Sequence, residues 1–180
     1  MFDLKVDDEI ILRTVEEGEA YQLFSLVDHN REYLGAYLPW VDHTHNIADS
    51  KAFISQMIAE TMDGTSLGVG IWVKGELAGH AGIMDIVPGH KATLGYWVAE
   101  NFSGAGIMTR AISALVEQAF TKYSLRRLLI EARSTNEKSI SLALRLGFQH
   151  EGAEVAGEFF RGEFYNLERF GLVRKPKAVS

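Results

Sequence analysis

The 180-residue sequence contains no cysteine, and this absence removes several kinds of chemistry at once. Disulfide bonds, thiolate metal sites and a cysteine nucleophile all need a sulfur atom that the sequence does not supply. The histidines of the segment HTH, His43 and His45, do not complete a metal site by themselves. We therefore expect a surface loop at these histidines, and we expect no metal.

Long apolar runs and an excess of positive charge are also missing. No stretch approaches the roughly 18 consecutive apolar residues of a membrane-spanning helix. The opening residues, MFDLKVDDEI, lack the basic flank and apolar run of a signal peptide. The net charge of −6 argues against general binding to nucleic acid. Together these absences predict a cytoplasmic protein whose partners are neither membranes nor nucleic acids.

The composition that remains is typical of one globular domain. Hydrophobic residues make up 47% of the chain and charged residues 23%, and no linker interrupts the pattern. Apolar periodicity predicts helices over 17–30, 48–62, about 104–123 and 136–146. It predicts strands over 10–15, 93–99 and 126–132, and hairpins over 66–86 and 148–173. We expect a mixed α+β fold in a single domain that spans residues 1–180.

Two glycines stand one residue apart in the segment NFSGAGIMTRA, between an apolar strand and a helix. The first backbone N–H groups of a helix have no partner inside it, so they suit an anion. Without side chains at Gly104 and Gly106, a phosphate has room to approach. The pattern lacks the lysine of a P-loop and the third glycine of a dinucleotide site. On the residues alone, a tight turn and a phosphate cradle remain equally open.

Three segments together carry a resemblance to a known family. NFSGAGIMTRA (101–111) resembles the Q/R-x-x-G-x-G/A acyl-CoA loop of the GNAT N-acetyltransferases, with Asn101 where glutamine or arginine is commoner. NEKSISLALRLGF (136–148) is similar to the N-x-x-S…L-G-F segment of their RimJ/RimL branch. NREYLGAYLPWVD (30–42) is similar to the N-terminal segment of RimL-type enzymes. The three matches come in the family's order and span most of the chain.

The resemblance implies a fold and a donor site. The GNAT fold has a central, mostly antiparallel twisted sheet, splayed where the cofactor binds, with about four helices. The implied cosubstrate is acetyl-CoA, without a metal. One of the arginines at 126 and 127 is expected near a CoA phosphate. The residues expected to hold acetyl-CoA are Tyr96, Trp97, Val98, Asn101, Gly104, Ala105, Gly106, Ile107, Met108, Asn136 and Ser139.

The resemblance also implies catalytic and acceptor-binding residues. An amine must lose a proton before it attacks, and a carboxylate can take it directly or through a water. Glu158 is the expected base and also contacts the acceptor, while Ser139 is expected to protonate the leaving thiolate. Tyr37 and Trp40 lie in the segment that covers the acceptor in the family. For Asn136 and Ser139 the alternative role is helix capping, and for Glu158 it is a solvent-facing strand residue.

The expected reaction is acetyl transfer from acetyl-CoA to an amine. The leading acceptor is the N-terminal α-amine of a protein, with a ribosomal protein suggested by the family. A small amine, such as a polyamine, an amino sugar or a peptide-like antibiotic, is the alternative. A non-catalytic CoA-binding module is a third. The aromatic closing hairpin and the resemblance together predict a homodimer or a higher homo-oligomer.

Overall fold

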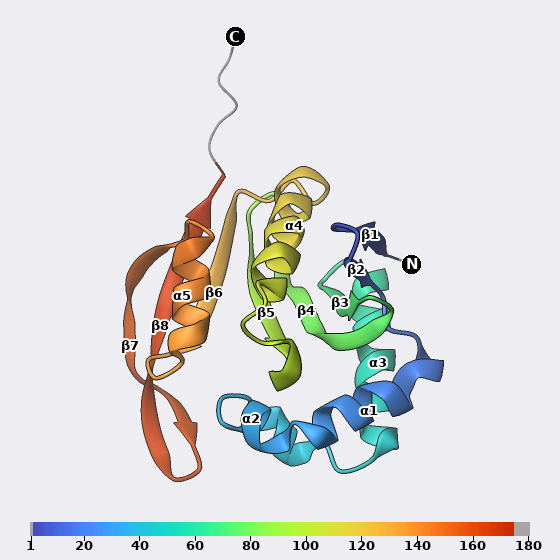
Figure 1. Ribbon diagram of the computed structural model, residues 1–180. Coiled ribbons are helices and arrows are strands. Elements are labelled where there is room, and N and C mark those ends of the chain that lie inside the picture. The colour runs from blue at the N-terminus through green and yellow to red at the C-terminus, as the bar shows by residue number, and fades with distance from the viewer. Residues whose placement is uncertain (1, 175–180) are drawn as a thin grey trace.

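A twisted sheet of eight strands forms the centre of the computed structural model, which describes residues 2–174 (Figure 1). The strand order is β1-β2-β3-β4-β5-β6-β8-β7, and every neighbouring pair is antiparallel except β5 and β6. The strands are β1 (Asp3–Lys5), β2 (Ile10–Arg13), β3 (Leu67–Val73), β4 (Glu76–Val87), β5 (Lys91–Val98), β6 (Arg127–Arg133), β7 (Gln149–Phe160) and β8 (Glu163–Val173).

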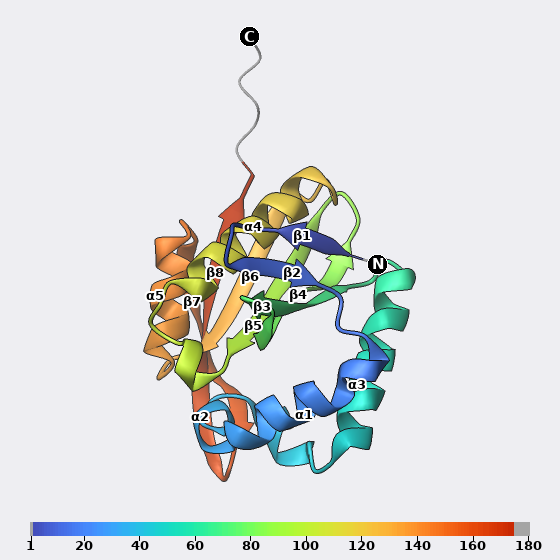
Figure 2. The ribbon, with the colours of Figure 1, turned by 45° about the vertical axis from the view of Figure 1, so that its right-hand side comes forward.

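Five α-helices accompany this sheet within residues 2–174. They are α1 (Ala20–His29), α2 (Arg31–Gly35), α3 (Ile47–Met62), α4 (Ile107–Thr121) and α5 (Glu137–Arg145). Three short 3₁₀ turns accompany them, η1 (Glu17–Glu19), η2 (Pro39–His43) and η3 (Glu100–Phe102). Helices α4 and α5 lie on one face, and α1 and α3 pack on the other (Figures 1 and 2). None of the helices in the described residues is long and apolar enough to cross a membrane.

Strand β3 shows why the sheet has a core on both sides. Its alternate residues Leu67, Val69, Ile71 and Val73 join the core under α4, as the alternation predicts. The remaining positions are buried too, because Trp72 packs into the second core, beneath α1 and α3. An added Cβ at Gly68 would lie 2.3 Å from Met57 of α3, so glycine lets that helix come close. Strand β3 is therefore buried on both faces.

The sheet splits between β5 and β6, as the mixed fold with a splayed centre predicts. These parallel strands pair over only three residues each, from Lys91 opposite Arg127 to Thr93 opposite Leu129. Beyond that point β5 continues to Val98 and β6 to Arg133, and the two strands diverge towards the end that α2 covers (Figure 1). The result is an opening in the middle of the sheet whose walls are strand edges.

The N-terminal third departs most from the expected elements. The helix expected over 17–30 begins as the 3₁₀ turn η1, ends at His29 and is followed by the separate short helix α2. With α2 the described residues contain five α-helices, where about four were expected. Strand β1, three residues long, has no apolar periodicity of its own and is held by pairing with β2.

Candidate active site

A cavity of about 180 Å³ lies in the opening between β5 and β6. It brings together five residues that the sequence singled out, and they come from the α2–η2 segment, β5, α5 and β7. These residues are Tyr37, Tyr96, Asn136, Ser139 and Glu158. Such a convergence of polar side chains from distant parts of the chain is the usual mark of a binding or catalytic site.

Two hydroxyl groups meet across this cavity. The Ser139 Oγ atom lies 2.9 Å from the phenolic oxygen of Tyr96, so one of the two donates a hydrogen bond to the other. Burial raises the pKa of Tyr96, and the hydrogen bond with Ser139 offsets part of that rise. Tyr96 therefore keeps its proton at neutral pH and has one to give.

Asn136 serves the helix that carries Ser139. Its side-chain oxygen accepts a hydrogen bond from the Ser139 backbone N–H at 3.2 Å, which makes it the N-cap of α5. At the other end of α5, Gly147 adopts φ of 85°, a conformation typical of the residue that ends a helix. The capping role considered for Asn136 is thus present in the structure, and it fixes where the Ser139 hydroxyl lies.

A bulge in β7 places Glu158. Glu154 pairs with Leu167 and Glu158 pairs with Tyr165, so three residues of β7 stand opposite Asn166 alone. The middle one, Ala156, adopts φ of 54°, and its N–H donates to the Asn166 side-chain oxygen at 2.9 Å. Bulges of this kind bend a strand and redirect its side chains.

The immediate partner of Glu158 is Arg133, which the sequence analysis did not single out. The Arg133 Nε atom donates to Glu158 Oε2 at 2.8 Å, and its Nη1 atom donates to the carbonyl of Ala36 at 2.8 Å. The chain neighbour Phe159, by contrast, is 63% exposed. The Glu158 carboxylate is therefore paired at the cavity wall with its side chain 22% exposed, and its role as the base stays a prediction. A lone arginine at the end of an apolar strand was the only signal in the sequence.

The loop before α4 has the features expected of an anion site. Gly104 and Gly106 are exposed, with φ of 84° and 73°. No backbone N–H of residues 104–109 donates to an acceptor among the described residues, and the first helical bond runs from Arg110 N to Gly106 O. A Cβ at either glycine would meet nothing within 4 Å. The exposed amides and the open space around them fit a phosphate group.

Two basic side chains reach this loop from α5. The Lys138 ammonium lies 3.3 Å from Ser103 Oγ, and Arg145 Nη1 donates to Thr109 Oγ1 at 3.1 Å. They border the amides of the loop. One of Arg126 and Arg127 was expected near a CoA phosphate, and Arg127 is paired with the carboxylate of Glu151. The expectation that one of these two arginines lies near a CoA phosphate stays a prediction.

The edge of β5 offers backbone groups to the cavity side. The N–H of Ala99 donates to the carbonyl of Ala78 in β4, and amides along a strand alternate in direction. The amides of Tyr96 and Val98 therefore point the other way, towards the gap that β6 leaves. This is the arrangement that pairing with an extended, amide-containing ligand requires.

Trp97, Trp40 and Asn101 lie apart from the cavity lining. The rings of Trp97 and Trp40 pack together with centroids 5.7 Å apart, between β5 and η2. Asn101, in η3, lines a separate hollow of about 610 Å³ beside α1. The structure therefore does not bring these three side chains to the two hydroxyls and the carboxylate.

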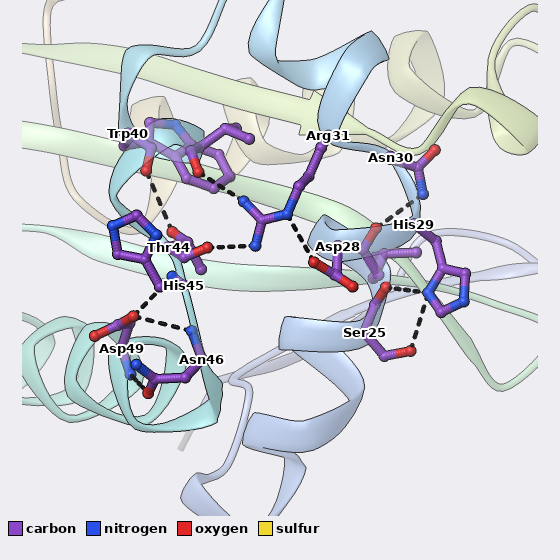
Figure 3. Close-up of polar contacts among 12 residues, drawn as sticks. Ser25, Asp28, His29, Asn30, Arg31, Trp40, Thr44, His45, Asn46 and Asp49 are labelled. Carbon is purple, nitrogen blue, oxygen red and sulfur yellow. Dashed lines mark hydrogen bonds and ion pairs between the residues drawn. The ribbon is translucent and has the colours of Figure 1, made fainter.

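The segment that carries Tyr37 and Trp40 is held by Arg31 (Figure 3). Arg31 donates to the backbone carbonyls of Val41 and Thr44 and to the carboxylate of Asp28. The Tyr37 hydroxyl in turn donates to the carbonyl of Thr135 at 3.1 Å. The segment thus closes one wall of the cavity in a fixed position.

Metal ligation has no support in the described residues, where no group of three or more His, Asp or Glu side chains is arranged to hold an ion. His43 and His45 lie at the end of η2 and just after it, as the expected surface loop requires.

Comparison with known proteins shows which family has this sequence and fold. The model of the "Acetyltransferase (GNAT) domain" matches residues 9–149. YdaF of Bacillus subtilis (strain 168), named as a ribosomal N-acetyltransferase, is 30% identical in a 178-residue alignment that covers 97% of each chain.

Two solved structures share the whole architecture. RimL, a ribosomal L7/L12 α-N-protein acetyltransferase in complex with coenzyme A, matches with a TM-score of 0.92 at 25% identity, over 96% of this chain and 98% of RimL. MccE, a microcin C7 self-immunity acetyltransferase in complex with acetyl-CoA and AMP, matches with a TM-score of 0.91 at 31% identity, over 95% of this chain and 96% of MccE. The resemblance carried by the three motifs is confirmed, and the chain belongs to the GNAT family of acetyltransferases.

Proposed function

We propose that this acetyltransferase moves the acetyl group of acetyl-CoA to the N-terminal α-amine of a protein, with a ribosomal protein as the acceptor. The observation that carries the proposal is the cavity at the split in the sheet, which is lined by three hydroxyl side chains, Tyr37, Tyr96 and Ser139, and two carboxylates, Glu131 and Glu158. The names of YdaF and RimL, which match over nearly their full lengths, point to ribosomal acceptors for those proteins.

Acetyl-CoA supplies an acetyl group activated as a thioester, and this chain has groups suited to each part of it. The free amides of residues 104–108 suit the diphosphate, with Lys138 and Arg145 beside them. The outward amides of β5 suit the pantetheine arm, as a strand edge suits any extended peptide. The amide of Val98 is the one we assign to the thioester carbonyl oxygen, where such a donor is typically worth about 3 kcal/mol.

On the acceptor side, Glu158 takes the proton that the ammonium must lose, directly or through a water. Its pairing with Arg133 fixes one carboxylate oxygen and leaves the other for this task. When the amine bonds to the acetyl carbon, the carbon–sulfur bond breaks and the departing thiolate needs a proton. The hydrogen-bonded hydroxyls of Ser139 and Tyr96 supply it.

A small amine is the second candidate acceptor. MccE, 31% identical, is named for self-immunity to microcin C7 rather than for a ribosomal protein. A cavity of about 180 Å³ also admits only the amine-bearing end of an acceptor, so its size suits a small molecule as well as a chain terminus.

A thiol-release assay with acetyl-CoA separates the candidates. The panel contains peptides that begin with different residues, polyamines, amino sugars and a peptide-like antibiotic. Turnover with peptides alone supports the proposal, and turnover with one small amine alone supports the second candidate. Binding of CoA without turnover on any acceptor would indicate a non-catalytic module and contradict both.

The role of Glu158 is tested by Glu158→Gln, with Glu154→Gln on the same strand as the matched control. We expect kcat to fall by about 10²–10⁴-fold in the first variant, the usual range for general acid–base catalysis. The control should stay close to wild type, because Glu154 contacts Arg169 and does not line the cavity. An unchanged kcat in Glu158→Gln would refute the assignment.

A further inference from the structure

Arg133 is the one charged residue that is buried within residues 2–174, with a side chain 4% exposed. Its Nε and Nη1 atoms have acceptors, but Nη2 is buried without a hydrogen-bond partner. Aromatic rings surround the guanidinium, with centroids 4.4 Å away for Tyr165 and 4.6 Å for Phe160. Apolar side chains often replace a buried ion pair without loss of stability. Fold stability alone therefore gives little reason to keep a charge here.

The charges around the cavity give a functional reason for an arginine at this position. Glu131 and Glu158 both line it. Arg169 pairs with Glu131 at 2.7 Å and with Glu154 at 3.0 Å, so it serves two carboxylates. The hydroxyls in the wall belong to Tyr37, Tyr96 and Ser139. Arg133 is thus the charge that offsets Glu158 at the place where the acceptor's nitrogen must arrive.

We propose that Arg133 determines the class of amine that the site accepts, by offsetting the charge of Glu158 so that strongly basic amines are disfavoured. An α-amine has a pKa of roughly 8 and is partly neutral when it arrives, whereas a lysine-like or polyamine nitrogen, with a pKa of roughly 10.4, arrives charged. A carboxylate alone attracts that charge, and the guanidinium beside it repels it. The paired site therefore favours α-amines. This inference rests on the proposed function, because it concerns the acceptor side of the same cavity.

The test compares acceptors in variants of one residue. Arg133→Gln removes the charge, and Arg133→Lys keeps it. Arg133→Met, which suits the aromatic surroundings, gives a second neutral variant if the glutamine folds poorly. Arg161→Gln is the matched control, because Arg161 lies over the same Phe160 ring but pairs with Asp42 outside the cavity lining. The measured quantity is the ratio of kcat/KM for a peptide α-amine to kcat/KM for spermidine.

We expect the neutral variants to lower this ratio by at least about tenfold, the equivalent of one pKa unit of charge interaction. Arg133→Lys should retain most of the wild-type preference, and Arg161→Gln should match wild type. The inference is overturned if the neutral variants lose activity equally on both amines, which is what a purely structural role gives. Wild-type protein that acetylates no amine at all would instead contradict the proposed function, so the two failures are distinct.

Discussion

His80 gives the structure a pH-dependent stability that can be measured directly. Its ring lies in β4 against α3, with Nε2 3.0 Å from the Met57 sulfur and the Phe53 ring 5.4 Å away, edge-on. Burial lowers the pKa of His80 from 6.5 to about 4, because this apolar pocket disfavours the charged imidazolium. The folded protein therefore binds fewer protons at this site than the unfolded chain between pH 4 and 6.5.

The sign and size follow from that difference. The contribution of neutral His80 to folding stability is complete above its unfolded-state pKa of 6.5. It is lost as the pH falls towards its folded-state pKa of about 4. Over the whole window the loss is about 3 kcal/mol, and between pH 8 and pH 5 it is about 2 kcal/mol. These figures are the contribution of His80 alone. Carboxylates also destabilise the fold in acid; one is Glu19, where a hydrogen bond from Arg13 lowers the pKa.

Urea denaturation of wild type and His80→Gln, each at pH 8 and pH 5, isolates the effect. We expect the wild type to lose about 2 kcal/mol more than the variant between the two pH values. His43→Gln, an exposed histidine near the end of η2, serves as the control and should behave as wild type. Equal losses in wild type and His80→Gln would refute the reasoning, because they would mean that His80 is charged in the folded protein.

Three further predictions concern the loop, the cap and the hairpin. Gly106→Ala should weaken CoA binding measured by calorimetry more than Gly75→Ala does, although both put alanine at a positive φ with open space around it. Asn136→Ala removes the N-cap of α5 and should lower the free energy of unfolding, measured by thermal unfolding, by about 1 kcal/mol. Asn46→Ala, at the N-cap of α3, should cost a similar amount, but only Asn136→Ala should also slow acetyl transfer. Phe164 is 69% exposed, so Phe164→Ser should abolish a dimer detected by light scattering; if wild type is a monomer, the predicted self-association is wrong.

The sequence predicted those parts of the site that depend on local chain geometry. Gly104 and Gly106 precede α4 and leave its first amides free, because glycine tolerates the positive φ that the turn needs. Asn136 and Ser139 stand three residues apart at a helix start, so their relation is fixed by the helix itself. The strand–helix order of this half of the chain followed from apolar periodicity for the same reason.

The parts that the sequence did not predict depend on contacts between distant segments. Arg133 and Glu158 are 25 residues apart in sequence. They meet because their strands, β6 and β7, both pair with β8, and because the bulge at Ala156 shifts the register of β7 against β8. Neither the shift nor the positive φ of an alanine has a local signal. The side chain of Trp97 packs against Trp40 rather than lining the cavity, because residues next to each other in β5 face opposite sides of the sheet.

The central claim is that free main-chain amides before α4 hold the diphosphate of the donor. The most direct measurement is an NMR titration that follows the amide signals of Gly104, Gly106 and Ile107 as coenzyme A is added. Pantetheine, which lacks the diphosphate, is the comparison ligand. We predict large shifts of these amides with coenzyme A and small ones with pantetheine. No shift with coenzyme A, or equal shifts with both ligands, would contradict the account.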